Sequence, residues 1–201
     1  MTSPVRPSAH SPLVQALATP HIVLLAVLAL VSVVAIVELR LGREPMCTCG
    51  YISLWHGSID SENSQQIFDW YSFTHVIHGI LFYGLLAIVL PRLPVPVRLL
   101  LAVCIEGAWE IAENSPFIIE RYRAATLSLN YYGDSVVNSV SDVFAMIVGF
   151  WMARRLPVWI TVTFVIAVEV MLAIVIRDNL TLNIIMLIHP VDAIKHWQLG
   201  S

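Results

Sequence analysis

Charged residues are scarce in this chain: Asp, Glu, Lys and Arg make up 12% of its 201 residues, against about 25% in an average soluble domain. The formal net charge is −3 and no block of Lys or Arg occurs, so the chain lacks the basic surface that nucleic-acid binding requires. Three cysteines are too few for a disulfide framework. No repeat or long linker divides the chain. These absences exclude DNA or RNA as a partner.

Hydrophobic residues, by contrast, make up 58% of the chain, and its mean hydropathy is +0.78. A helix that crosses a bilayer needs about 20 largely apolar residues. Runs of about this length cover residues 21–39, 72–90, 97–114, 135–153 and 157–176. The sequence therefore predicts an all-α fold: a polytopic membrane helix bundle of about five transmembrane helices, with the lipid bilayer as its surroundings.

The rest of the chain is arranged around these runs. Residues 1–20 are polar and Pro-rich at their start and are predicted to be a disordered tail. Residues 21–177 form one transmembrane domain, with outer loops over residues 41–71 and 115–134. Residues 178–201 are predicted to be an interfacial segment, because "LTLNIIMLI" is too short to span a membrane.

Arginine placement predicts the orientation. The two shortest loops carry Arg92 with Arg98, and Arg154 with Arg155. Short loops rich in Arg and Lys stay on the cytoplasmic side. The N-terminus is therefore expected inside and the C-terminus outside.

Polar residues recur at similar depth in three consecutive runs. His75 and His78 lie three residues apart in the first turns of run 72–90. Glu106, Glu110 and Glu113 follow at i, i+4 and i+7, on one face of the next helix. Ionisable groups inside a membrane are costly and usually functional. We therefore expect them to face one another in a buried site that opens outward.

The fourth run adds a third polar face. Ser135, Asn138 and Asp142 follow at i, i+3 and i+7, and Asp134 stands at the predicted cap. We expect Asn138 and Asp142 to orient the other groups of the site. Glu169 lies in the outer half of the last run.

Two kinds of chemistry suit these residues. His75 and His78, with Glu110 and Glu113, form a set that a divalent metal such as Zn, Fe or Mn accepts. Alternatively, Glu110 and Glu106 act with a histidine in metal-free acid–base catalysis. No standard metallohydrolase motif is present to decide between them.

The second outer loop carries Arg121 and Arg123 among tyrosines. Arginine suits phosphate binding, so these two residues are candidates for holding the phosphate of a lipid or lipid-linked substrate. The alternative is an interfacial belt of tyrosines with snorkelling arginines.

Cysteines and C-terminal histidines give weaker signals. Cys47 and Cys49 are spaced too tightly for an easy mutual disulfide; metal binding with His56, or a strained or intermolecular disulfide, are alternatives. Cys104 is predicted to pack in the core. His189, Asp192 and His196 would share a helical face. They are either a second ligand set or part of a solvated amphipathic helix that Trp197 anchors.

Several strings together resemble an uncharacterised family of bacterial multi-pass inner-membrane proteins, a domain of unknown function. They are "GREPMCTCG", "LWHG", "NSQQ", "DWYSFTHVIHGILFY", "WEIAENSPFIIERYR" and "YYGDSVVNSVSD". The resemblance implies a location in the bacterial cell membrane and no activity. The chain is also similar to VanZ-like small membrane proteins, whose pattern would place His75, Glu110, Asp134, Asn138 and Asp142 in corresponding positions.

Three functions follow. The first is an enzyme, a hydrolase or transferase, that acts on a lipid or lipid-linked phosphate at the outer leaflet. The second is a non-catalytic assembly or accessory protein in which the cluster fixes helix packing. The third, which the apolar inner halves of the runs disfavour, is a proton or metal-ion transporter.

Overall fold

The computed structural model describes residues 11–125 and 131–200. Within this part of the chain all regular secondary structure is helical, apart from one isolated β-bridge that joins Trp55 to Phe68. This confirms the all-α class. The helices are α1 (Pro12–Leu17), α2 (Pro20–Arg40), α3 (Ser72–Val89), α4 (Val95–Glu113), α5 (Pro116–Ala125), α6 (Val136–Arg155), α7 (Val158–Val175), α8 (Leu180–Ile188) and α9 (Asp192–Leu199).

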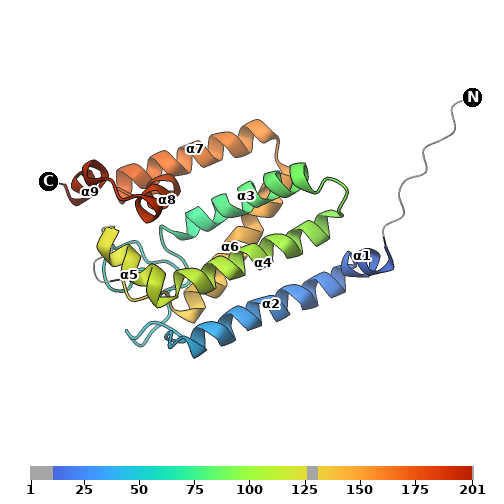
Figure 1. The fold of residues 1–201 in the computed structure, drawn as a ribbon, viewed down its shortest axis with the longest axis horizontal. Helices are drawn as coiled ribbons and strands as arrows, with labels where there is room; N and C mark the ends of the chain where they lie inside the picture. Colours follow the sequence, from blue (N-terminus) through green and yellow to red (C-terminus); the bar gives the residue numbers. More distant parts are fainter. Residues whose placement is uncertain (1–10, 126–130, 201) are drawn as a thin grey trace, which may run out of the picture.

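Four helices, α2, α3, α6 and α7, are long and apolar enough to cross a membrane. They correspond to four of the five predicted spans and define a membrane protein. The remaining span corresponds to α4, which has 19 residues and runs alongside the others (Figure 1). Its composition is more polar, because it carries one arginine and the three glutamates of the predicted site.

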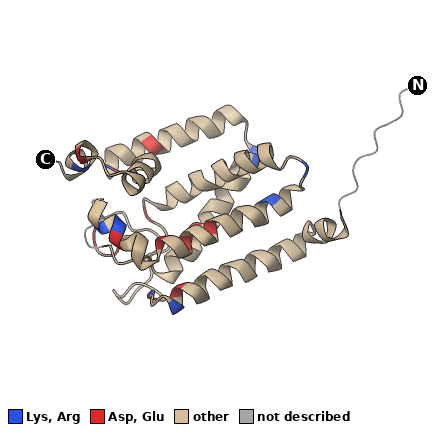
Figure 2. Cartoon of the chain, viewed as in Figure 1, with Lys and Arg blue, Asp and Glu red and all other residues tan. Residues whose placement is uncertain are grey.

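The long helices give the molecule two different ends (Figure 1). We call the end that holds residues 41–71 with α5, α8 and α9 the loop end, and the opposite end, with the short connections 90–94 and 156–157, the Arg end. In Figure 2 the acidic residues of the long helices lie toward the loop end, whereas basic residues lie at both ends. Acidic groups are therefore concentrated at one end of the bundle.

Close packing of α3 against α6 sets the centre of the bundle. A Cβ added to Gly79 would overlap the backbone of Met146, and one added to Gly149 would overlap the Val76 carbonyl. Glycines at such crossings let two helix backbones approach one another in a membrane. This crossing holds His75 and His78 of α3 beside Asp142 of α6.

An apolar core fills the bundle between the polar layer and the Arg end. Its buried members are Val27, Val31, Leu86, Leu99, Leu100, Ala102, Val103, Val143, Met146 and Phe150. On the other side of α3, Ile77 packs against Val168, Leu172 and Ile176, which attaches α7.

The structure differs from the predicted boundaries in two places. Inside the predicted N-terminal tail, α1 forms because Ser11 accepts a hydrogen bond from Val14 N and a proline occupies the first turn. Inside the predicted loop 115–134, α5 begins at Pro116, another proline suited to a first helical position. Residues 1–10 of the tail and 126–130 of the loop lie outside the described residues.

Of the two predictions about cysteines, only the one for Cys104 is wrong. Cys47 and Cys49 form a disulfide, one of the alternatives that their spacing left open, because the turn brings their Cα atoms to 5.2 Å, within the range that disulfides need. Cys104 is exposed on α4 rather than packed in the core, because it lies outside the faces that α4 turns toward its neighbours.

Candidate functional site

The site begins with two histidines that share one carboxylate. His75 Nδ1 lies 2.6 Å from Glu106 Oε1. His78 Nδ1 lies 3.1 Å from both Glu106 oxygens. An ionised carboxylate only accepts hydrogen bonds, so both histidines donate from Nδ1. Glu106 is fully buried and His75 nearly so, which makes this pairing a buried link between α3 and α4.

Two more carboxylates flank His75. Glu110 Oε1 lies 3.3 Å from His75 Nδ1, and Asp142 Oδ2 lies 3.8 Å from His75 Nε2. Among the described residues, neither Glu110 oxygen has a hydrogen-bond partner, and Asp142 Oδ1 has none either. The Glu110–His75 distance is thus that of an ion pair without hydrogen-bond geometry. Buried polar atoms are normally bonded, so these orphaned oxygens mark a place built for something other than packing.

A cavity of about 320 Å³ opens onto this cluster. His75, His78 and Asp142 lie on its polar side together with Glu113 and Asp134. The apolar part of the lining comes from α3, α4 and α8. Its residues are Leu81, Phe82, Trp109, Leu180, Ile184 and Leu187. Leu81 and Ile184 are about half exposed, so part of the apolar lining reaches the surface.

The predicted metal set differs from the arrangement in the structure. His75, His78 and Glu106 each offer one ligand atom within 4.8 Å of the others. Glu110 and Glu113 stand one and two turns further along α4, so Glu106 is the carboxylate that reaches both imidazoles. Two nitrogens and one carboxylate oxygen are a ligand set that zinc and iron accept.

Local hydrogen bonds explain why the histidines sit where they do. Asp69 accepts hydrogen bonds from Ser64 N at 2.7 Å and Tyr71 N at 2.8 Å. Its own N–H donates to Ser72 Oγ, the first residue of α3. Burial raises the pKa of Asp69, although these donors oppose the shift. These contacts join the end of the loop to the first turn of α3, one turn before His75.

Asn138 supports the loop and does not bond to the histidines. Its Nδ2 donates to Gln66 O at 2.9 Å. Ser135, one turn earlier, caps α6 and donates to Gln65 O. Gln65 in turn donates to Gly133 O. The residues on the predicted face of α6 therefore have two roles. Ser135 and Asn138 hold residues 65–66 in place, whereas Asp142 lies beside His75.

Asn114 is a buried hub that sequence reasoning missed. Its Oδ1 accepts from Asp134 N at 2.7 Å. Its Nδ2 lies within 3.3 Å of Glu38 Oε1, Glu110 O, Asp134 Oδ2 and Ser139 Oγ; two hydrogens serve these four acceptors in turn. The signal in the sequence was a lone acid, Glu38, one turn before the end of an apolar run.

Asp134 lines the cavity and lies just before α6, outside the membrane-spanning helices. Its charge depends on pH. Burial raises the pKa of Asp134 to about 6, against the hydrogen bonds that it accepts from Tyr131 and Asn114. Tyr131 Oη donates to Asp134 Oδ1 at 2.9 Å. The negative charge at this side of the cavity therefore increases as the pH rises through about 6.

The predicted phosphate-binding arginines have backbone partners. Arg121 Nε donates to Leu187 O at 2.8 Å and a second nitrogen to Ile188 O, so Arg121 caps the end of α8. Arg123 donates to Tyr131 O. Neither arginine is among the described residues that line the cavity. Their phosphate-binding role stays a prediction.

The C-terminal segment joins the site through α8. Asn183, Ile184 and Leu187 line the cavity, and Tyr122 donates to Asn183 Oδ1 at 3.0 Å. Glu169 holds α8 in place, because its carboxylate accepts from the first backbone N–H groups of that helix. His189 ends α8 in an extended conformation, whereas Asp192 and His196 lie in α9, so the three do not share one helix; in the described part of the chain, neither histidine joins a potential metal group.

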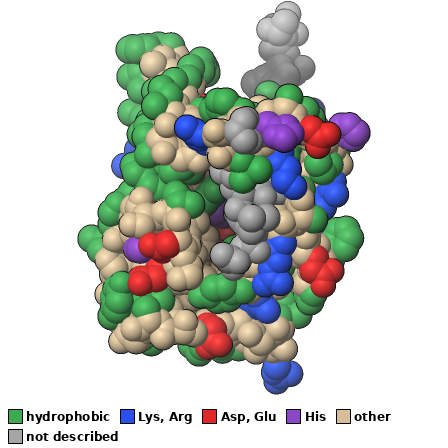
Figure 3. All heavy atoms as spheres, turned by 90° about the vertical axis from the view of Figure 1, so that its left-hand side faces the viewer, with side chains coloured by type: hydrophobic (Ala, Val, Ile, Leu, Met, Phe, Trp, Pro, Cys, Tyr) green, Lys and Arg blue, Asp and Glu red, His purple; other side chains and the backbone are tan. Residues whose placement is uncertain are grey.

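Figure 3 looks onto the loop end, where histidine, acidic and basic side chains gather among apolar ones. At this end lie an amphipathic cavity lined by His75, His78, Asp134 and Asp142, and two further buried carboxylates, Glu106 and Glu110, behind His75. The fold and site define an α-helical membrane protein with a one-sided polar site.

Comparison with known proteins gives the family. A family model described as a protein of unknown function, DUF2585, matches residues 38–200. A UPF0314 protein of Sphingopyxis alaskensis is 53% identical over 174 residues, which cover 86% of this chain and 93% of the relative. One of Paracoccus denitrificans is 56% identical over 161 residues, or 80% and 83% of the two chains. The chain belongs to the DUF2585 family. No solved structure matches it.

Membership confirms the predicted resemblance to an uncharacterised bacterial family. The predicted similarity to VanZ-like proteins stays a prediction. The names of these relatives describe no activity. The site is therefore the basis for inferring a function.

Proposed function

We propose that this protein is a membrane enzyme, a hydrolase or group transferase, whose substrate is a lipid or a lipid-linked phosphate. The observation that carries the proposal is the cavity. One wall is apolar, its mouth is flanked by the exposed side chains of Leu81 and Ile184, and its base ends at His75, His78 and Asp142. An amphipathic molecule fits this arrangement with its chain on the apolar wall and its polar group on the cluster.

The residues divide into two roles. Asp142 and His75 face the cavity and are the candidates for contact with the reacting atoms. Glu106 fixes His75 through Nδ1, which directs Nε2 of that histidine toward Asp142. Glu110 lies beside the same Nδ1 and would take up a proton through His75. An imidazole between carboxylates is a common acid–base arrangement.

The same histidines fit a divalent metal. His75, His78 and Glu106 supply three protein ligands, and the cavity leaves a further position for water or substrate, as catalytic zinc sites do. A bound zinc, iron or manganese ion would polarise a carbonyl or phosphoryl oxygen.

We further propose that the protein lies in the bacterial inner membrane with its loop end on the periplasmic side. The Arg end carries Arg92 in the connection 90–94, and Arg154 and Arg155 in the last turn of α6, which the positive-inside rule assigns to the cytoplasm. The N-terminus would then be cytoplasmic, the C-terminus periplasmic, and the cavity would open toward the outer leaflet. Labelling of single cysteines with a membrane-impermeant reagent tests this orientation; labelling at the Arg end of intact cells would contradict it.

A transporter is less well supported, because a relay of polar groups would have to continue through the bundle. Between the cluster and the Arg end, the described buried residues are mostly hydrophobic, with Arg98 and Thr161 as buried polar exceptions. A purely structural cluster is the stronger alternative, since the Glu106 bridge itself joins α3 to α4.

Metal content is the first test. The untagged protein is purified in mild detergent under oxidising conditions, and bound transition metals per chain are measured by mass spectrometry. We expect about one equivalent, lost in His75→Ala. His21→Ala is the matched control, since His21 is exposed on α2. Metal retained in His75→Ala would overturn this metal site; no metal in any sample would leave the metal-free acid–base form of the proposal.

Turnover is the second test. Protein in vesicles of bacterial polar lipids, with and without a polyprenyl diphosphate, is incubated and the lipids are analysed by mass spectrometry. The proposal expects a lipid change that Asp142→Asn abolishes while the protein remains folded. If Asp142→Asn is as active as the unaltered protein, or no lipid changes, the enzyme proposal fails and the structural reading replaces it.

A further inference from the structure

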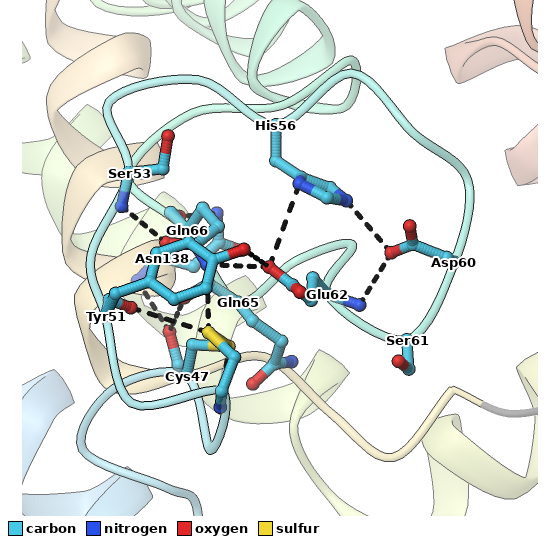
Figure 4. Close-up of a disulfide and its surroundings, with 12 residues drawn as sticks. Cys47, Tyr51, Ser53, His56, Asp60, Ser61, Glu62, Gln65, Gln66 and Asn138 are labelled. Atoms are coloured by element: carbon cyan, nitrogen blue, oxygen red, sulfur yellow. Dashed lines mark hydrogen bonds and ion pairs between the residues drawn. A yellow bond between two sulfur atoms is a disulfide. The ribbon is translucent and has the colours of Figure 1, made fainter.

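A second cluster of ligand-type side chains lies in the loop over residues 41–71, apart from the cavity. Cys47 is buried, whereas Cys49, to which it is joined by a disulfide, is exposed. Glu62 and His56 approach from the other side of the same loop (Figure 4). None of these four residues lines the described cavity, so the proposed enzyme site leaves them unexplained.

Both sulfur atoms receive N–H donors. Cys49 N donates to Cys47 Sγ at 3.2 Å, and Gln66 Nε2 donates to Cys49 Sγ at 3.3 Å. The sulfur of a disulfide is a weak acceptor, and a thiolate is a much better one, because hydrogen bonds to ionised groups are stronger. These two donors therefore suit the reduced, ionised pair better than the disulfide, whereas the Tyr51 carbonyl oxygen, 3.5 Å from Cys49 Sγ, suits a thiol at that position.

Gln66 connects the sulfur atoms to a carboxylate. Its amide also donates to Glu62 Oε2 at 3.1 Å, and its Oε1 accepts from Ser53 N at 2.6 Å. Gln66 is fully buried, so its amide orientation is fixed. Tyr51 Oη donates to the same Glu62 oxygen. Hydrogen bonds that orient ligands in this way are typical of metal sites.

The ligand atoms of Cys47, Cys49 and Glu62 all lie within 4.8 Å of one another. His56 Nδ1 is 3.9 Å from Glu62 Oε2, and its other nitrogen bonds to Asp60 at 2.9 Å. His56 stands outside this close group of three and would have to approach it to become the fourth ligand; two thiolates, one carboxylate and one imidazole are ligands that zinc accepts in tetrahedral geometry. A histidine ligand that bonds a carboxylate through its second nitrogen is a common feature of such sites.

We propose that this loop is a redox-controlled zinc site. A small-molecule dithiol gives two electrons and two protons to the Cys47–Cys49 disulfide, forms its own disulfide, and leaves two thiols. Zinc then binds Cys47, Cys49, Glu62 and His56, and both thiol protons are released. Oxidation of the two thiolates by a disulfide of the same class reverses the step and releases the metal.

Cobalt(II) is a suitable probe, because it occupies zinc sites and absorbs in the near ultraviolet when thiolates bind it. The full chain in detergent, with His75→Ala and His78→Ala to remove the other candidate metal set, is reduced with a phosphine, freed of reductant and titrated with cobalt. We expect the thiolate band at one equivalent, its loss on adding one equivalent of zinc, and no band in the oxidised protein.

Variants assign the ligands. Cys47→Ser with Cys49→Ser is expected to abolish the band, whereas Cys104→Ser, the matched control, leaves it unchanged. Gln66→Ala is expected to weaken cobalt binding about 10–100-fold, as loss of an orienting partner does, and Glu62→Gln to weaken it at least as much. Circular dichroism reports whether each variant is folded.

Three results would overturn the proposal: no thiolate band in the reduced protein, the same band in the oxidised protein, or unchanged cobalt affinity in Glu62→Gln. The last test does not depend on the cysteine variants, so it decides the question even if the double serine variant fails to fold. None of these readouts depends on lipid turnover, so this site stands or fails separately from the proposed enzyme.

Discussion

Replacing Glu110 with glutamine separates a functional cluster from a structural one. Glu110 is 1% exposed, and among the described residues neither of its carboxylate oxygens has a hydrogen-bond partner. Its Oε1 lies 3.3 Å from His75 Nδ1. A buried carboxylate in this position costs folding free energy that a packing role would not require.

The magnitude follows from what the substitution removes. Glutamine keeps the shape of Glu110, deletes its charge and breaks no hydrogen bond made by the side chain. We expect the free energy of unfolding to stay unchanged or to rise by about 1–3 kcal/mol, the usual range for relief of an unsatisfied buried group. Activity on the lipid substrate is expected to fall at least about 100-fold, the lower range for loss of an acid–base group.

Glu106→Gln is the matched control on the same helix face. Glu106 accepts from both histidines, so its replacement leaves buried partners unpaired and should cost about 3–5 kcal/mol. Both variants are unfolded with denaturant in the same detergent micelles, and the midpoints are compared. If Glu110→Gln destabilises as much as Glu106→Gln while turnover persists, the cluster is structural and the reasoning is refuted.

Three further predictions concern packing, pH and access. Gly79→Ala should destabilise by about 1–3 kcal/mol or more, because the new Cβ overlaps the backbone of α6, whereas Gly84→Ala, with open space around it, should be neutral or slightly stabilising in thermal melts. As the pH rises from about 4 to about 6, Asp134 loses its proton in the unfolded chain but keeps it in the folded protein, where its pKa is about 6. Stability should therefore fall over this window, and Asp134→Asn should flatten the slope measured by denaturation at each pH. Ile184→Trp should narrow the cavity mouth and raise KM, whereas Ile185→Trp, on the same helix but outside the described lining, should leave it unchanged; equal effects would reject this entrance.

The sequence predicts the helices well because length and apolar content decide them. The span of α2 was expected over residues 21–39 and forms over Pro20–Arg40. Side-chain faces follow from the same geometry: His75 and His78 both reach Glu106 because positions three apart share one side of a helix. Glu106 and Glu110, four apart, both approach His75. Each of these relations is local, so a single helix suffices to predict it.

Relations between helices could not be predicted in the same way. The depth of α4 relative to α3 decides that Glu106, and not Glu113, meets both histidines, and this depth depends on packing that no single helix encodes. Asn114 was missed for the same reason, because its partners come from α2, α6 and the segment before α6. Arg121 and Arg123 were expected to face a ligand, but in the structure they donate hydrogen bonds to the backbone carbonyl groups of Leu187 and Tyr131.

The polar layer is confined to one end of the bundle, and this limits what the protein can do. Asp69, Asp134 and Asp142 are buried at or near the loop end, whereas no described carboxylate is buried toward the Arg end, where the core is mostly hydrophobic. Burying these carboxylates opposes folding, so the apolar core and the close contact of α3 with α6 must offset that cost. A protein that needed only helix packing could replace the cluster with apolar residues and gain stability. The position of the cluster at the base of a cavity with an apolar mouth therefore favours chemistry on a molecule that enters from the membrane.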